Sequence, residues 1–354
     1  MSGQKEFFSM IIRFDSDYVE GVHPAILEEM ARTNLEQTVG YGEDPYCASA
    51  RGRIQAACRA PEAAVHFLVG GTQANATVIA SILRPHQGVL CAATGHINVH
   101  ETGAVEATGH KVLALPPTDG KISAAQVEQA VRAHYADGAF EHIAQPGMVY
   151  ISHPTELGTL YSLAELTALS EVCRRYDLPL FLDGARLGYG LAAGDVTLPD
   201  LARLCDVFYI GGTKCGALFG EAVVITAPNL KKDFRYHIKQ RGGMLAKGRL
   251  LGIQFDVLFS GGRYAAICAG AVRQAARVRQ ALRERGVPLL IDSPTNQLFP
   301  ILTCAQRDFL ARQFALSAWQ MMPDGREAMR ICLSWASSEE NVQKLLQAIA
   351  AMPA

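Results

Sequence analysis

The chain has 354 residues, of which 49% are hydrophobic and 19% are charged, a composition typical of a compact globular protein and not of a disordered chain. Its 33 lysines and arginines nearly balance its 34 aspartates and glutamates, which gives a formal net charge of -1. This balance provides no general attraction to nucleic acid or to a membrane surface, so we expect a small molecule as the partner.

The N-terminal residues and the cysteines bear on the cellular compartment. Residues 1–6 are polar and lead into only a short apolar run, so they lack the core of a secretory signal. No apolar run is long enough to span a bilayer. The nine cysteines form no CxxC pair, which suits reduced thiols better than a disulfide framework. We therefore expect a cytoplasmic protein.

Short runs rich in β-branched and aromatic residues recur along the chain and alternate with helical patterns. The runs predict strands at 65–69, 89–92, 111–115, 148–152, 180–183, 206–210 and 222–225. Apolar residues at helical spacing predict helices that include 72–83, 123–134 and 162–176. This alternation is typical of an α/β fold with a mainly parallel sheet covered by helices, which binds its ligands at the carboxyl ends of the strands.

The pattern changes after about Gly243. A long helix is expected over 264–285, followed by short strands and helices and by an amphipathic stretch at 339–349. We therefore divide the chain into a large domain at 1–243 and a smaller one at 244–354. The loop at 40–46 has two tyrosines among turn-forming residues, so it is either a surface connection or a loop that brings side chains to a site.

The segment 70–75, Gly-Gly-Thr-Gln-Ala-Asn, joins a predicted buried strand to a predicted helix. Glycines let the backbone approach an anion, and the free amides at the start of a helix bind phosphate without a cationic side chain. We predict that Gly71 and Thr72 contact a phosphate group. An ordinary turn is the alternative.

Two histidines, His96 and His100, stand at helical i, i+4 spacing. A zinc site would need a third ligand, and no further ligand cluster is evident in the sequence. The other interpretations are that His96 stacks on the ring of a cofactor, or that it is a hydrogen-bonded histidine at the start of a helix.

A carboxylate and an amine are expected to meet at the ends of two neighbouring strands. Asp183 ends the strand at 180–183, with Arg186 three residues later, and Lys214 follows the glycine-rich turn after the next strand. The 31 residues between Asp183 and Lys214 span one strand-helix-strand crossover, so the two side chains can converge. A pyridoxal 5′-phosphate site needs this pair, because the lysine forms a Schiff base with the cofactor and the aspartate holds the pyridinium proton.

Arg330 lies within the apolar run 328–335, which predicts a strand. Burial of a guanidinium is costly without a partner, and its fork of donors suits a carboxylate. The partner is either the substrate or an internal acidic residue.

These residues form an ordered set that resembles the threonine aldolase branch of the β-eliminating lyases. The set consists of Asp17, Gly71, Thr72, His96, Asp183 with Gly184, Ala185 and Arg186, then Lys214 and Arg330. The resemblance implies a pyridoxal-phosphate-dependent transferase-like fold of the aspartate aminotransferase type (fold type I). The smaller C-terminal domain is then also an α/β domain.

The resemblance also implies a role for each matching residue. Lys214 would carry the cofactor, Asp183 would pair with the ring nitrogen and Arg186 would lie beside the phenolate oxygen. His96 would stack on the ring, Gly71 and Thr72 would hold the phosphate, and Ser16 and Arg330 would bind the substrate carboxylate. A homodimer or homotetramer with active sites shared between subunits is implied as well, with the loop at 40–46 near the junction.

The implied reaction is retro-aldol cleavage of a β-hydroxy-α-amino acid, such as L-threonine, L-allo-threonine or phenylserine, to glycine and an aldehyde. The alternative is another reaction of the same fold, namely β-elimination, transamination or racemisation. The sequence departs from the family pattern at Gln73, at Cys215 and around 151–156. It therefore leaves the base open among His96, His153 and an ordered water.

Overall fold

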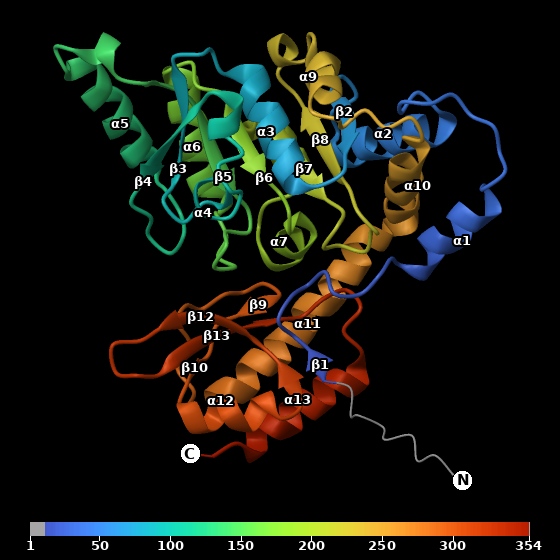
Figure 1. Ribbon diagram of the computed structural model, residues 1–354, viewed down its shortest axis with the longest axis vertical. Coiled ribbons are helices and arrows are strands. Elements are labelled where there is room, and N and C mark those ends of the chain that lie inside the picture. Colours follow the sequence, from blue (N-terminus) through green and yellow to red (C-terminus); the bar gives the residue numbers. More distant parts are fainter. Residues whose placement is uncertain (1–10, 354) are drawn as a thin grey trace.

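The computed structural model describes residues 11–353, and a seven-stranded sheet forms its larger part (Figure 1). The strand order is β2-β8-β7-β6-β5-β3-β4, in which β7, β6, β5, β3 and β4 are parallel and β8 is antiparallel to both of its neighbours. The strands are β2 (Ala64–Leu68), β3 (Gln87–Ala92), β4 (Lys111–Leu115), β5 (Gln145–Ser152), β6 (Leu180–Asp183), β7 (Val207–Gly211) and β8 (Glu221–Ile225). The predicted mainly parallel sheet is therefore confirmed, since all seven predicted runs are strands.

Helices cover both faces of the sheet because successive strand residues point to opposite sides. Phe181 and Tyr209 belong to the core on one face, whereas Leu182 and Ile210 belong to the core on the other. The first face is covered by α3 (Gly71–Ile82) and α9 (Phe234–Gln240). The second face is covered by α2 (Pro45–Cys58), α5 (Ala124–Ala136), α6 (Leu163–Arg175), α8 (Leu198–Leu204) and α10 (Arg249–Leu258).

Local signals explain where several helices begin. Ser123 and Ser162 cap α5 and α6 through reciprocal capping boxes with Gln126 and Glu165. Gly70, at the start of α3, has no side chain and provides no such cap. The remaining helices near the sheet are α1 (Pro24–Arg32), α4 (His96–Val99) and α7 (Leu187–Ala193).

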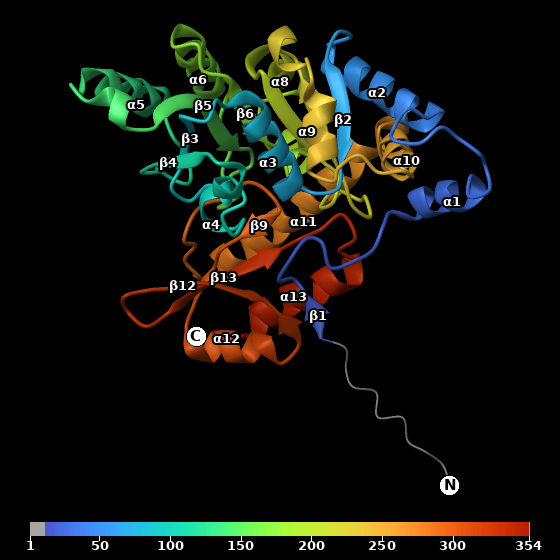
Figure 2. The ribbon, with the colours of Figure 1, turned by 45° about the horizontal axis from the view of Figure 1, so that its top comes forward.

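A second, smaller core lies below the carboxyl ends of the parallel strands in Figures 1 and 2. It contains β9 (Gln297–Leu298), β10 (Ile301–Leu302), α12 (Cys304–Ala311), β11 (Phe314–Ala315), β12 (Ser317–Met321), β13 (Glu327–Cys332) and α13 (Glu339–Ala351). The long helix α11 (Arg263–Glu284) continues from the large core into this one. The predicted boundary at residue 243 stays a prediction, and β1 (Ile12–Arg13) pairs with β11 in the smaller part.

The structure also bears on two expectations from composition. All nine cysteines are free thiols, and eight of them are buried. No helix within residues 11–353 is both long and apolar enough to cross a membrane. The polar stretch at 1–6 lies outside the described residues.

Candidate active site

Two adjoining cavities lie between the carboxyl edge of the sheet and the smaller core. The inner cavity, of about 280 Å³, is lined by residues that include Gly71, Thr72, Asp183 and Glu221. The outer cavity, of about 540 Å³, is lined on the side of the smaller core by Ser317, Ala318, Trp319 and Arg330. The residues common to both cavities are Tyr18, His96, Glu156, Arg186 and Lys214. The crossover predicted from sequence therefore brings Asp183 and Lys214 to one site.

Asp183 is a buried carboxylate in the inner cavity, and neutral groups hold it from four directions. One oxygen accepts hydrogen bonds from the Tyr209 hydroxyl and from the Ala185 amide, the latter at 2.9 Å. The other accepts from the Tyr150 hydroxyl and from Asn75 Nδ2, the latter at 3.0 Å. Within residues 11–353 no cationic group lies within ion-pair distance of it. The inner cavity therefore offers a fixed negative charge that suits a cationic ring nitrogen.

A chain of hydrogen bonds connects Asp183 to His96. Asn75 Nδ2 also donates to Glu101 Oε1 at 2.7 Å, and this oxygen lies 2.7 Å from His96 Nδ1. Burial opposes protonation of the imidazole, but the hydrogen bond to Glu101 raises the pKa of His96 above its ordinary value. The ring is thereby fixed at the wall of both cavities.

Lys214 follows β7 and faces both cavities. Its amine lies 5.7 Å from the centre of the Tyr18 ring and makes no hydrogen bond or ion pair within the described part of the chain. Nearby, the buried Glu221 accepts from the Gly212 amide at 3.0 Å and from Thr213 Oγ1 at 2.8 Å. Burial raises the pKa of Glu221 to about 7. The lysine is thus held on a constrained turn with its amine free to react.

The start of α3 provides a place for an anion. Gly70, Gly71 and Thr72 line the inner cavity, and no side chain caps their amides. A Cβ atom on Gly71 would lie 3.0 Å from the Tyr209 hydroxyl, so a side chain at this point would press on a group that bonds Asp183. The amides at the start of α3 fit the phosphate of pyridoxal 5′-phosphate, and the free amine of Lys214 fits its aldehyde. The Asp183 carboxylate, which has no cationic partner in the described residues, fits the ring nitrogen.

Arg186 is fixed by a partner far away in the sequence. Its Nε and Nη2 atoms donate to the two oxygens of the buried Asp17 at 2.7 and 2.9 Å. Asn296 Nδ2 donates to the same carboxylate at 2.9 Å. Burial opposes ionisation of Asp17, but Arg186 holds its pKa below the ordinary value. This pair leaves one end of the guanidinium, Nη1, for a ligand in the cavity.

Arg330 faces the outer cavity, and no acidic side chain within residues 11–353 forms an ion pair with it. Nη2 donates to the Asp15 carbonyl at 2.9 Å, Nε is buried without a partner, and the guanidinium lies 5.5 Å from the centre of the Trp319 ring. An internal acidic partner, the alternative from sequence, is not found in the described residues. Ser16 follows Asp15 directly, but it lines neither cavity. Its buried hydroxyl has no hydrogen-bond partner within residues 11–353.

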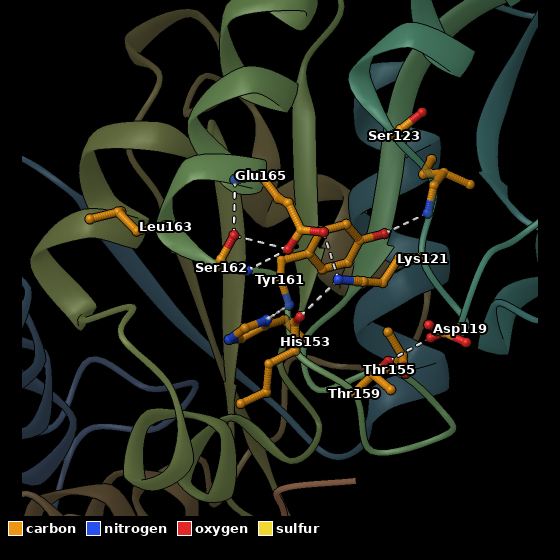
Figure 3. A network of polar contacts seen from close by, with 12 residues as sticks. Asp119, Lys121, Ser123, His153, Thr155, Thr159, Tyr161, Ser162, Leu163 and Glu165 are labelled. Carbon is orange, nitrogen blue, oxygen red and sulfur yellow. Dashed lines mark hydrogen bonds and ion pairs between the residues drawn. The ribbon is translucent and has the colours of Figure 1, made fainter. Parts of the chain in front are cut away.

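The other histidines occupy different surroundings. His153 is fully buried and lines neither cavity; its Nδ1 accepts from the Tyr161 amide at 3.3 Å (Figure 3). Burial lowers the pKa of His153 to about 4. The rings of His96 and His100 are 5.6 Å apart, and no group of three potential metal ligands exists among residues 11–353.

Sequence reasoning did not identify several residues of the site. Tyr150 and Tyr209 resemble ordinary core residues of strands, although each is placed to reach the carboxylate of a neighbouring strand. Asn75 ends the segment 70–75 and Glu101 directly follows His100, but nothing in the sequence pairs them. Glu156, at the strand end that departs from the family pattern, is another such residue, as are Tyr18, Glu221 and Trp319.

Known proteins resemble this chain over nearly its whole length. The family model described as β-eliminating lyase matches residues 13–290. A solved structure of threonine aldolase from Leishmania major is 43% identical, covers 96% of this chain and 98% of that chain, and has a TM-score of 0.93. A low specificity L-threonine aldolase from Pseudomonas sp. (strain NCIMB 10558) is 28% identical over 346 residues, which are 96% of this chain and 97% of the relative.

A more distant structure bears on the fold alone. Aspartate aminotransferase from Thermus thermophilus is 14% identical and has a TM-score of 0.69 over 96% of this chain and 91% of that chain. The predicted aspartate aminotransferase-like fold is therefore confirmed.

Proposed function

Because the chain belongs to the β-eliminating lyase family, we propose that it is a pyridoxal-phosphate-dependent carbon–carbon lyase of the threonine aldolase type. It cleaves a β-hydroxy-α-amino acid of the L-threonine, L-allo-threonine or phenylserine type to glycine and an aldehyde. The observation that carries this proposal is the unpaired Arg330 guanidinium, which shares a cavity with the free amine of Lys214. An amino acid has a carboxylate that would pair with Arg330. It also has an amine, which would react at the position where Lys214 holds the cofactor.

The residues of the inner cavity bind and tune the cofactor. When bound, pyridoxal 5′-phosphate accepts the electron pair that is released when a bond to the substrate Cα breaks. Lys214 would attach it covalently, and the Gly71 and Thr72 amides would bind its phosphate. Asp183 would hold a proton on the ring nitrogen, and His96 would contact the ring.

The residues of the outer cavity orient the substrate. Arg330 would bind the carboxylate through its free donors, and this contact would fix the orientation of the bonds at Cα. Arg186 retains Nη1 for the phenolate oxygen, while Asp17 fixes its direction. Ser16 as a second carboxylate partner remains a prediction, supported by its place next to Asp15, whose carbonyl bonds Arg330.

The products of L-threonine test the proposed reaction. The holoprotein should release glycine and acetaldehyde in equal amounts, because Cα–Cβ cleavage gives one of each. Ammonia with a 2-oxo acid would instead indicate elimination, and formation of D-allo-threonine without cleavage would indicate inversion at Cα, the reaction of a racemase. Either result would contradict the proposal.

Replacement of Arg330 by leucine should weaken substrate binding by about 2–3 kcal/mol, because a charge-assisted pair to the carboxylate is lost. The cleavage rate should also fall, since the substrate loses its orientation. The cofactor absorption spectrum and the thermal midpoint should change little, because no acidic side chain within residues 11–353 loses an ion-pair partner. Steady-state kinetics and thermal unfolding measure the two effects.

Arg326→Leu is the matched control for this variant. Arg326 lies at the turn before β13, and within residues 11–353 its side chain bonds only the exposed Asp324. Its kinetics should match those of the parent. Normal kinetics in Arg330→Leu together with a sharply lowered midpoint would contradict the substrate role.

We further propose a homodimer or homotetramer with active sites shared between subunits. Support comes from exposed apolar side chains beside the loop at 40–46, with Leu35 92%, Val39 67% and Tyr41 47% exposed. We also propose a cytoplasmic location, with neither nucleic acid nor membrane as partner, in keeping with the free thiols and the near-zero net charge. Sedimentation of the holoprotein measures the mass of the assembly directly.

A further inference from the structure

The Glu156 carboxylate lines both cavities, and within residues 11–353 only one of its two oxygens accepts hydrogen bonds. Its Oε1 accepts from Ser152 Oγ at 2.6 Å and from the His96 amide at 2.9 Å. Its Oε2 is buried and has no hydrogen-bond partner within residues 11–353. A buried carboxylate oxygen without a donor is costly, so a partner from the cavity, such as a hydroxyl group, would stabilise it.

The loop that carries Glu156 is fixed on both sides. The Thr155 amide donates to the Thr159 carbonyl at 2.9 Å, and the hydroxyls of these threonines lie 2.6 Å apart (Figure 3). Thr159 Oγ1 donates to the Asp119 carbonyl at 2.6 Å. From the smaller part, Thr295 Oγ1 donates to the Gly158 carbonyl at 3.0 Å. Glu156 is therefore held in position before any substrate binds.

The histidines near this wall are less suited to take a proton from a substrate. His153 lines neither cavity, and Figure 3 shows it beside Tyr161. His96 already engages Glu101 through Nδ1 and has its place beside the cofactor ring. His100 lines only the outer cavity and is mostly exposed to solvent.

We propose that Glu156 accepts the proton of the substrate β-hydroxyl group during cleavage, an inference that rests on the proposed aldolase function. The O–H bond breaks, and its electron pair forms the second bond between the oxygen and Cβ as the aldehyde leaves. The Cα–Cβ pair remains at Cα, where the bound cofactor stabilises it. The proton on Glu156 then passes to solvent, and Cα takes up a proton from solvent, so that atoms and charges balance.

The surroundings of Glu156 favour this role. Burial raises the pKa of Glu156 above its ordinary value, although the hydrogen bond from Ser152 opposes the rise. A carboxylate with a raised pKa is a stronger base than an exposed one. Ser152 and His96 hold one oxygen and leave the other, the better base, without a donor.

Glu156→Gln tests the proposal, because glutamine keeps an oxygen acceptor for Ser152 and His96 but cannot take a proton. Cleavage of L-threonine should fall on the order of 10²–10⁴-fold. Exchange of the glycine α-proton with deuterium, followed by NMR, involves no β-hydroxyl group and should stay within about threefold of the parent. The affinity for glycine, measured from the change in cofactor absorption, should also be unchanged.

Two further variants complete the experiment. Glu156→Asp retains a carboxylate and should recover part of the lost cleavage. Glu165→Gln is the matched control, because Glu165 pairs with Lys121 at 2.6 Å in the network of Figure 3 and lines neither cavity. It should cleave at the parent rate.

The outcomes separate this proposal from the proposed function. A parent protein that releases no glycine from L-threonine would overturn the aldolase function and the role of Glu156 together. An active parent with equally active Glu156→Gln would overturn only the role of Glu156. An equal loss of cleavage and of glycine exchange in Glu156→Gln would also overturn it, because the effect would then not depend on the β-hydroxyl group.

Discussion

Lys214→Ala should abolish covalent attachment of the cofactor and lower L-threonine cleavage by about 10³-fold or more, as expected when a covalent catalytic residue is removed. The variant should remain folded, because the Lys214 amine has no hydrogen bond or ion pair to lose within residues 11–353. Borohydride reduction of the parent holoprotein, followed by peptide mass spectrometry, should find the cofactor on Lys214 alone. The variant treated in the same way should carry no label.

Lys344→Ala serves as the matched control. Lys344 is an exposed lysine of α13 that pairs with Glu340 at 2.7 Å. This variant should retain both the label at Lys214 and the parent activity. A label on a peptide centred on a different lysine of the parent would contradict the assignment.

Asp183→Asn should reduce the cleavage rate on the order of 10²–10³-fold while the cofactor still binds. A neutral amide cannot hold the ring proton, so the electron sink is weakened when charge develops at Cα. The surroundings add to the effect, because Tyr150, Tyr209, Asn75 and the Ala185 amide all point donors at the two oxygens. In the asparagine variant, Nδ2 would replace one carboxylate oxygen. It would then face two hydrogen-bond donors instead of accepting from them.

Asp206→Asn separates this effect from the loss of a hydrogen-bonded carboxylate elsewhere in the sheet. Asp206 precedes β7 and accepts from the Leu180 amide at 2.8 Å, so it lies at the opposite end of the same strands. Its cleavage rate should be close to that of the parent, whatever its thermal midpoint. Turnover of Asp183→Asn at the parent rate would show that Asp183 does not act on the ring nitrogen.

The sequence predicted the fold well because its signals are local. Short, continuously apolar runs such as 180–183 mark buried strands, and the capping residues Ser123 and Ser162 mark helix starts in the sequence itself. The sequence also predicted that Asp183 and Lys214 lie at one site, because one crossover between adjacent parallel strands fixes where both strands end.

The contacts that fix the site could not be predicted in this way because they join distant segments. Asp17 meets Arg186 across 169 residues, and Asn75 meets Asp183 across 108. His153 and Glu156 stand three residues apart on the same strand end, and only the path of the loop decides which one faces the cavities. Side-chain direction in a loop depends on such tertiary contacts, and no periodicity encodes it.

A crystal structure of the holoprotein with glycine bound would locate the cofactor and the substrate together, and so decide whether Lys214, Asp183 and Arg330 form the active site. We expect the cofactor on Lys214, with its ring nitrogen hydrogen-bonded to Asp183 and its phosphate at the amides of Gly71 and Thr72. The glycine carboxylate should contact Arg330. A cofactor bound away from Lys214 and Asp183, or a glycine carboxylate that leaves Arg330 free, would contradict the account.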